Sequence, residues 1–250
     1  MCLAELLSFE EFKKKIVIVP LASMEDHGVL PLGTDYIIAD CIRAKLAKTF
    51  AEKNMCSKTA ILPVLPYTVS IEHRAAITAK PATLLLLLRE VFASIARYTS
   101  SIIVLIVHGG VEPIAYMAAR EASVENNARI VLVSVAEAAR KVVLRHGLPI
   151  ACVLHADPME ASLLLACGEK GRGIREASLD EVSNYCNMLA KNCPWQKPWI
   201  WREYEHVLYP DQPVPAIERL GHEIVEEVVG MVLDAVNRLE ECCSRQGRRY

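Results

Sequence analysis

Short apolar runs rich in β-branched residues alternate with longer segments of helical periodicity along this chain. Such alternation is typical of β–α–β units, in which parallel strands are buried on both faces by helices. The expected strands are 16–20, 60–64, 101–107, 129–134 and 150–154. The pattern therefore predicts an α/β fold: a three-layer α/β/α sandwich with a mostly parallel central sheet.

Segments with apolar residues at helical spacing fill the gaps between these strands. The expected helices are 35–53, 81–98, 113–126, 136–146 and a long C-terminal helix with an apolar stripe from Ile217 to Val232. Between about 168 and 212 the periodicity weakens, and prolines cluster there with all three tryptophans. We expect one domain over residues 1–250, with this excursion serving as a lid, a partner surface or a flexible segment.

Composition and charge exclude several classes of protein. A hydrophobic content of 52% is too high for a disordered chain, and a net charge of −2 leaves no basic excess for binding nucleic acid. The longest apolar stretches are far shorter than the roughly 18–20 residues that a membrane span requires. The order of charges at the N-terminus is the reverse of a secretory signal, so we expect a cytoplasmic location.

The nine cysteines show no Cys-x-x-Cys pair and no zinc-finger spacing, so a structural zinc site is not expected. An odd count argues against a fully paired disulfide framework. The plainest interpretation is that these cysteines are small buried hydrophobic residues. Disulfides of the kind that intracellular proteins of hyperthermophiles carry stay open as an alternative.

Ligands of open parallel sheets bind beyond the carboxyl ends of the strands, so the residues there are candidates for chemistry. Three of the expected strands are followed by acids or histidines: Glu25, His27, Asp35, His108, His155 and Glu160. Carboxylates and imidazoles together suit Zn²⁺, Mn²⁺ or Fe²⁺. A carboxylate such as Asp35 can bridge two ions, which then hold a nucleophilic hydroxide and polarise a carbonyl.

Less specific interpretations exist for each of these residues. A single histidine after a strand is more often a loop or core residue, and Asp35 could cap the following helix. Glu72 and His73, in the loop after the second strand, could face the pocket, or Glu72 could form a surface ion pair with Arg74. Glu112 could be a ligand, although the start of a helix is the favoured interpretation.

Four segments resemble motifs of the creatininase family of metal-dependent amidohydrolases. Residues 21–35, LASMEDHGVLPLGTD, resemble its opening signature, G-S-x-E-x-H-G-x-H-L-P-L-G-T-D. Residues 70–73 (SIEH) are similar to its S-x-E-H loop, and 107–110 (VHGG) to its N-G-H-G-G-N segment. Residues 155–162 (HADPMEAS) are similar to H-A-G-E-x-E-T-S. The segments occur in the family's order.

The resemblance implies an α/β/α sandwich that binds two divalent ions, Zn, Fe or Mn. Glu25 and His108 would hold one ion and His27 the other, while Asp35 would bridge them and Glu160 would complete the second site. The implied protein is a homo-oligomer that acts on a small molecule.

The resemblance also implies hydrolysis of a non-peptide C–N bond by a metal-bridged hydroxide. His155 would donate a proton or contact the substrate, and Glu72 and His73 would be further catalytic residues. Some features depart from the family's pattern: the loop after His27 is one residue shorter and lacks a second histidine, and Asp157 begins an altered fourth motif. Losing orienting hydrogen bonds of this sort typically costs about 10- to 100-fold in affinity or activity.

The chain looks closest to the archaeal deformylase branch of the family. That branch removes the formyl group of 2-amino-5-formylamino-6-ribosylaminopyrimidin-4(3H)-one 5'-monophosphate in riboflavin and F420 biosynthesis, and Arg74 or Lys80 could anchor the phosphate. One alternative is creatinine hydrolysis, against which Gly110 counts because the creatininase pattern has a glutamate there. Another is a catalytically impaired binding or oligomeric scaffold protein. A dinucleotide-binding protein is set aside, because no G-x-G-x-x-G motif follows the first strand.

Overall fold

The computed structural model describes residues 2–171, 173–192 and 205–246, with side chains as far as residue 241. Within these residues the main sheet has four strands in the order β2-β1-β3-β4, and every neighbouring pair is parallel. The strands are β1 Ile16–Leu21, β2 Thr59–Ile61, β3 Ser101–Ile106 and β4 Arg129–Ser134. The arrangement confirms the predicted α/β fold with a mostly parallel central sheet.

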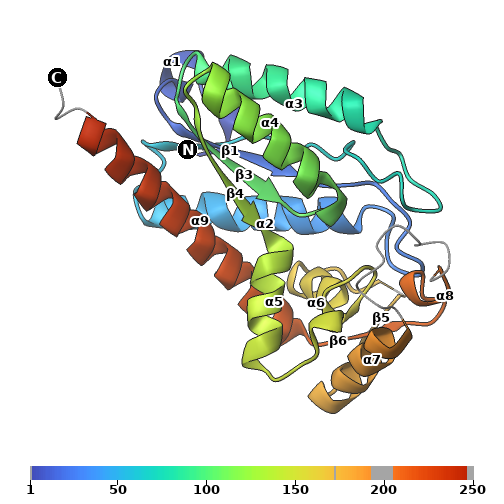
Figure 1. The fold of residues 1–250 in the computed structure, drawn as a ribbon. Coiled ribbons are helices and arrows are strands. Elements are labelled where there is room, and N and C mark those ends of the chain that lie inside the picture. The colour runs from blue at the N-terminus through green and yellow to red at the C-terminus, as the bar shows by residue number, and fades with distance from the viewer. Residues whose placement is uncertain (1, 172, 193–204, 247–250) are drawn as a thin grey trace.

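Different pairs of helices cover the two faces of the sheet. Their bounds are α2 Thr34–Glu52, α3 Pro81–Ala96, α4 Glu112–Glu125 and α9 Glu218–Gln246. Helices α3 and α4 lie on one face, and α2 and α9 lie on the other (Figure 1). Residues along β1 alternate accordingly: Val17 and Val19 pack in the core beneath α3 and α4, whereas Ile16 and Ile18 belong to the core of the opposite face. All four are buried, which explains the continuous apolar run.

The two central strands, β1 and β3, end side by side. Leu21 is in register with Ile106, and the Val107 amide donates to the Leu21 carbonyl at 3.0 Å. From β1 the chain moves outward to β2 on one side and later to β3 and β4 on the other. Such a switch point in a parallel sheet is where ligands bind. The segments that leave β1 and β3 therefore enter one place.

Five further elements flank this framework: η1 Ala4–Leu6, α1 Phe9–Phe12, η2 Gly109–Val111, α5 Val135–Arg145 and α6 Pro158–Ala166. Helix α6 packs tightly on α9, where the Ile217 amide donates to Ser162 Oγ at 2.9 Å. A Cβ atom on Gly221 would lie 2.0 Å from the Ser162 carbonyl oxygen. None of the described helices is both long and apolar enough to cross a bilayer.

The prediction of a fifth strand over 150–154 is wrong, because residues Ile150–Cys152 form a short 3-10 helix, η3. Pro149 has no amide hydrogen to offer a neighbouring strand, and its carbonyl accepts from the Cys152 amide at 3.0 Å, which closes a turn. Ala151 and Cys152 are buried where this segment packs on α7, Leu179–Asn192, rather than by strand pairing. A short apolar run does not by itself distinguish a buried strand from a buried turn.

The excursion at 168–212 contains regular structure. Strand β5 Ile174–Glu176 pairs in parallel with β6 Val214–Ala216, and α7 and α8 Glu205–Leu208 lie between them in sequence. The interpretation of weak periodicity is wrong over α7, where Val182, Cys186 and Leu189 form a buried stripe at helical spacing. The three tryptophans, at 195, 199 and 201, lie outside the described residues.

Three disulfides join six of the described cysteines: Cys2–Cys56, Cys41–Cys167 and Cys152–Cys186. The interpretation of these six as unpaired hydrophobic residues is therefore wrong, and disulfides, which the sequence left open, are present. Cysteine spacing in the sequence does not reveal these disulfides, because each joins cysteines that are far apart in the chain and meet only in the folded structure. The Cys41–Cys167 bridge connects α2 to the residue that ends α6, and both helices contribute to the site below.

We expect reduction of these disulfides to lower the free energy of unfolding by several kcal/mol, because each bridge restricts the unfolded chain and typically contributes about 2–4 kcal/mol. Urea unfolding with and without a phosphine reductant measures the difference. Mass spectrometry after alkylation of the unfolded, unreduced protein is the control. Alkylation of all six cysteines without reductant would contradict the bridges.

Candidate metal centre

Four histidines and three carboxylates converge beyond the carboxyl ends of β1 and β3: Glu25, His27, Asp35, His73, His108, His155 and Glu160. The structure thus brings together all five predicted metal ligands. All seven except Glu160 are buried, and the Glu160 side chain is 22% exposed. They come from the loop after β1, the start of α2, the loop before α3, the end of β3 and the segment around the start of α6.

His108 faces two of the carboxylates. Its Nδ1 lies 3.3 Å from Glu25 Oε1 and 3.1 Å from Asp35 Oδ2. The other ring nitrogen, Nε2, lies 2.8 Å from the Val69 carbonyl oxygen. Because a carbonyl only accepts hydrogen bonds, it holds a proton on Nε2, and Nδ1 is available as a ligand atom when a cation is bound.

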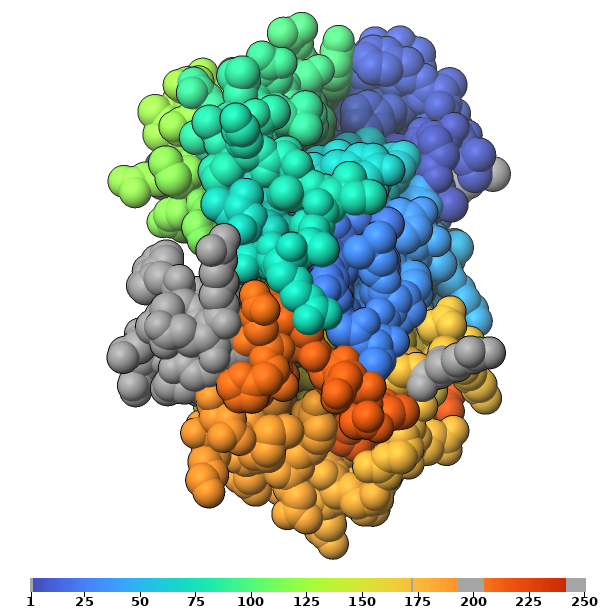
Figure 2. Space-filling view, turned by 90° about the vertical axis from the view of Figure 1, so that its right-hand side faces the viewer, coloured from blue at the N-terminus to red at the C-terminus, as the bar shows by residue number. Residues whose placement is uncertain are grey.

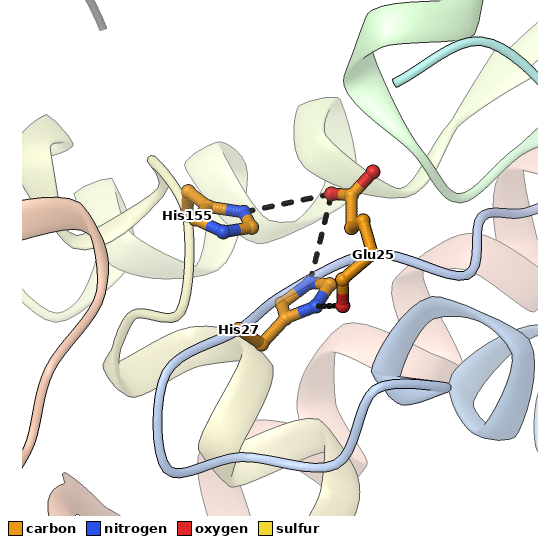
Figure 3. Close-up of side chains that lie close together, drawn as sticks. All are labelled: Glu25, His27 and His155. Atoms are coloured by element: carbon orange, nitrogen blue, oxygen red, sulfur yellow. Dashed lines mark hydrogen bonds and ion pairs between the residues drawn. The ribbon is translucent and has the colours of Figure 1, made fainter. Parts of the chain in front are cut away.

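His27 is the centre of a second group. Its Nε2 lies 3.8 Å from Asp35 Oδ1 and 3.8 Å from Glu160 Oε2. Its Nδ1 donates to the Glu25 backbone carbonyl at 2.9 Å, as the dashed line within this pair shows (Figure 3). The ring is therefore oriented in the same way as that of His108, with one nitrogen held by a carbonyl and the other directed at carboxylates.

Asp35 lies between these two groups. Its Oδ2 faces His108, and its Oδ1 faces His27. The Ser23 hydroxyl donates to Oδ2 at 2.8 Å and fixes the carboxylate. Helix α2 has Gly33 at its N-cap without a side-chain cap bond, so Asp35 does not serve as the cap. The two oxygens are placed as a bridging carboxylate requires.

A pair of divalent cations fits the unpaired atoms of this cluster. Among the described residues, Glu25 Oε2, His27 Nε2 and Glu160 Oε2 are buried without a hydrogen-bond partner. Leaving each such atom unpaired costs about 1–3 kcal/mol, which a bound cation would offset. Three sets of ligand atoms lie within 4.8 Å of one another: Glu25–His27–His155, Glu25–His73–His108 and His27–Asp35–Glu160. Metal–ligand bonds of about 2.0–2.2 Å are compatible with that spacing.

The electrostatics of the cluster also favour cations. Burial raises the pKa of Glu25, but the hydrogen bond and charge of His108 outweigh it and hold the pKa well below its usual range. Burial opposes a charged His108, yet Asp35 and Glu25 raise its pKa well above the usual value. Burial, followed by the charges of Asp157 and Asp35, raises the pKa of Glu160 well above its usual range. Without metal, a protonated His108 balances the Glu25 carboxylate, and Glu160 retains its own proton.

His155 completes the cluster: its ring faces the Glu25 carboxylate, and the His27 ring lies beside both (Figure 3). Its Nδ1 lies 3.6 Å from Glu25 Oε1, and its Nε2 lies 2.9 Å from the Asp26 carbonyl oxygen. Burial and then the neighbouring His27 lower its pKa well below the usual value. The ring is therefore neutral, with Nδ1 directed at the ligand cluster.

Tyr209 is a site residue that the sequence analysis did not identify. Its hydroxyl accepts from the Arg74 amide at 3.2 Å and lies 3.1 Å from His73 Nδ1. The carboxylate of Glu25, which only accepts hydrogen bonds, faces the other ring nitrogen, and this favours a phenol that donates to Nδ1. His73 then carries its own proton on Nε2, which lies 3.2 Å from Glu25 Oε1. Burial lowers the pKa of His73 to about 4 and raises that of Tyr209 to about 12, so both are neutral. No motif surrounds Tyr209 that could have indicated it.

The loop after His27 holds Tyr209 in place. The Val29 amide donates to the Pro210 carbonyl at 3.0 Å. Gly28 has a φ of +63°, and a Cβ atom there would lie 2.4 Å from the same carbonyl oxygen. Only glycine fits this turn, which lets the shortened loop close. The orange segment that contains α8 and β6 accordingly lies against the blue segment after β1 (Figure 2).

Glu72 lies beside the cluster and is 25% exposed. Its Oε1 is 4.0 Å from His73 Nε2, and burial raises its pKa. A Cβ atom on Gly110 would lie 2.4 Å from Glu72 Oε1 and 2.5 Å from His108 Nε2. The Glu72 carboxylate therefore takes the space that a side chain at position 110 would need.

The alternative ion pair between Glu72 and Arg74 is not formed. Arg74 Nε instead donates to Asp26, and the guanidinium carbon lies 4.3 Å from the centre of the Tyr209 ring. Part of the Arg74 guanidinium is thus engaged by Asp26, and its role as a phosphate anchor stays a prediction. Glu112 is exposed at the first position of α4, as the helix-start interpretation predicts.

A family model described as creatinine amidohydrolase (Creatininase) matches residues 5–236. No curated protein sequence matches the chain significantly. A crystal structure of creatinine amidohydrolase (creatininase) is 15% identical, with 94% of this chain and 96% of that chain covered and a TM-score of 0.69. A creatininase described as the Mn form is 15% identical, with 94% and 97% covered and a TM-score of 0.63. A creatininase variant described as the Zn–Zn type is 14% identical, with 94% and 97% covered and a TM-score of 0.65. At such identities the likeness shows a common fold.

Proposed function

Because this chain belongs to the creatininase family, we propose that it removes a formyl group from a nitrogen of a small molecule. Members of this family are metal-dependent amidohydrolases that act on C–N bonds other than peptide bonds. The position of Asp35 carries the proposal. Its two oxygens face two ligand groups that both contain buried, unpaired atoms. We assign Glu25 and His108 to one ion, and His27 and Glu160 to the other.

Two divalent ions held in this way would lower the pKa of water and polarise the amide carbonyl. The Mn and Zn–Zn descriptions of the creatininase structures favour manganese or zinc over iron. The residues of the chain supply orientation. Backbone carbonyls fix the His27 and His108 rings, and Tyr209 directs the His73 proton at Glu25. We place His155 as a neutral contact beside Glu25 that can take part in proton transfer.

Glu72 is the proposed proton carrier. It is partly exposed, it lies next to the cluster, and burial raises its pKa toward the range in which a carboxylate both accepts and donates protons. In this role it takes a proton from the attacking water and gives it to the leaving nitrogen. No other described residue of the cluster combines exposure with the absence of an assigned ligand role.

We expect Glu72→Gln to lower kcat by about 10²- to 10⁴-fold, the usual contribution of a general acid–base group. The metal content should not change, because Glu72 is not among the grouped ligand atoms. Steady-state turnover and elemental analysis of the same preparation measure both effects. Glu112→Gln, an exposed helix-start variant, should behave as the wild type. Full turnover by Glu72→Gln, or loss of its metal, would show that the assignment is wrong.

The substrate we propose is the formylamino-pyrimidine ribotide of the deformylase branch. Gly110 supports this substrate over creatinine, because the creatininase pattern has a glutamate at that position. In this chain the Glu72 carboxylate occupies the space that a side chain at position 110 would need. Elemental analysis of protein purified without added metal, followed by titration with Zn²⁺, Mn²⁺ and anaerobic Fe²⁺, comes first. Release of formate from the ribotide would then support the proposal, whereas creatine formation would favour creatinine hydrolysis. A protein that binds no ion even after titration would fit the scaffold alternative.

We further propose a homo-oligomer in the cytoplasm. Exposed apolar side chains on the outer helices α3 and α4 favour self-association: Leu86, Leu87, Tyr116 and Met117. Size-exclusion chromatography with light scattering tests this. Three disulfides in a cytoplasmic protein are a combination known from hyperthermophiles.

A further inference from the structure

A cavity of about 110 Å³ opens beside the second ligand group. This volume is well above the ~10–15 Å³ that one water molecule needs. Asp35 and Glu160 both line the cavity, and Glu160 is the one partly exposed member of the group formed with His27. The cavity therefore offers a small molecule space directly beside this group.

Most of the cavity wall is apolar. It includes Ile38, Val107, Val135, Met159 and Leu163, which suit a flat ring or a short carbon chain. Gly109 also lines it, and a Cβ atom there would meet nothing within 4 Å, so the backbone leaves space for a ligand.

The charged side chains of the wall divide into carboxylates and a single guanidinium. The carboxylates are the two proposed ligands, Asp35 and Glu160, and Asp157. Asp157 already accepts hydrogen bonds from the backbone amides of Leu154, Met159 and Glu160. Within the described part of the chain, Arg140 of α5 is the one cationic side chain of the wall.

Arg140 differs from the other basic residues of the same helix. Lys141 and Arg145 both pair with Glu227 of α9. Arg140 is exposed and has neither an ion pair nor a hydrogen bond among the described residues. An exposed arginine at the wall of this cavity, with no partner for its donors among the described residues, offers the planar, bidentate geometry that binds a phosphate or a carboxylate.

We infer that Arg140 binds an anionic group of the substrate, a phosphate monoester or a carboxylate, while the scissile amide lies at His27, Asp35 and Glu160. This inference rests on the proposed function and defines the class of substrate: a small amide that carries an anionic group at the end remote from the scissile bond. It also favours Arg140 over Arg74 as the anchor, because Arg74 contacts Asp26 and Tyr209 and does not line the cavity. Lys80, the other expected anchor, precedes α3 and does not line the cavity.

Isothermal titration calorimetry of the metal-loaded protein tests the inference with three probes of similar size: ribose 5-phosphate, ribonate and neutral ribose. We expect at least one anion to bind more tightly than ribose, and Arg140→Ala to weaken that anion at least 10-fold. Arg140→Lys should recover part of the loss. Arg145→Ala, a matched control on the same helix, should leave binding unchanged. Comparing the two anions distinguishes a phosphate from a carboxylate.

Equal anion binding by wild type and Arg140→Ala would overturn the inference, as would equal losses in Arg140→Ala and Arg145→Ala. The inference would also be overturned if neither ribose 5-phosphate nor ribonate bound to the wild type with a lower dissociation constant than ribose. Because calorimetry needs no turnover, the anion site and the hydrolysis are judged separately. If no amide is hydrolysed but anion binding depends on Arg140, the proposed function fails and the anion site stands. Hydrolysis of a neutral formamide without Arg140-dependent binding would show the opposite.

Discussion

Replacement of Asp35 by asparagine is expected to reduce the metal content from about two ions per chain to none, because one carboxylate serves both proposed sites. Its two oxygens face His108 and His27 separately, and an amide offers only one neutral oxygen to a metal. Turnover should fall by more than roughly 100-fold, which is the most that loss of an outer-shell partner alone typically costs. Elemental analysis and steady-state kinetics measure the two effects.

Asp40→Asn is the matched control for this experiment. Asp40 lies on the same helix, is exposed, and contacts Arg43 at 3.6 Å outside the cluster. It should keep its ions and its turnover. Retention of both ions by Asp35→Asn would exclude a bridging role, and retention of one ion would mean that Asp35 belongs to a single site.

The second large effect is on stability. Gly221→Ala is expected to lower the free energy of unfolding by about 3 kcal/mol, the upper range for overpacking a well-packed contact. The new methyl carbon would lie 2.0 Å from the Ser162 carbonyl oxygen, and that backbone belongs to α6 and cannot rotate away. Urea denaturation gives the free-energy difference.

Gly230 offers a control in the same helix, α9. A Cβ atom there meets nothing within 4 Å, so Gly230→Ala should stabilise the protein by up to about 1 kcal/mol through helix propensity alone. The two variants make the same chemical change, and their opposite signs would isolate the contact between α6 and α9. A destabilised Gly230→Ala, or an unaffected Gly221→Ala, would contradict this packing.

The predictable part of the fold is the part that repeats a local pattern. Strands β3 and β4 and the helices α2 to α5 were predicted close to their bounds, because strands buried on both faces and amphipathic helices leave a periodic signal. The predictions failed at the 150–154 run, where a strand was expected, and at helix α7, where no helix was expected, for opposite reasons. The first has strand-like composition but turns at Pro149, and the second has a helical stripe obscured by the aromatic and proline-rich segment that follows.

The site divides in the same way. Its five expected ligands follow strands or begin helices, so sequence position places them at one sheet edge. Tyr209 and Arg140 had no such signal. Tyr209 reaches His73, and Arg140 lines the adjoining cavity, only when distant segments of the chain pack together. The role of Gly110 likewise depends on the position of the Glu72 carboxylate, which comes from a loop whose path cannot be inferred from periodicity.

The order of the proposed ligands along the chain bears on how the protein acquires its ions during synthesis. Glu25, His27 and Asp35 leave the ribosome together, whereas Glu160 follows Glu25 by more than half of the chain. A nascent chain therefore offers one imidazole and two carboxylates on a flexible segment, a set that discriminates little among divalent metals. Discrimination among metals would then require His108 and Glu160, which reach the cluster only once the parallel sheet and α6 have formed.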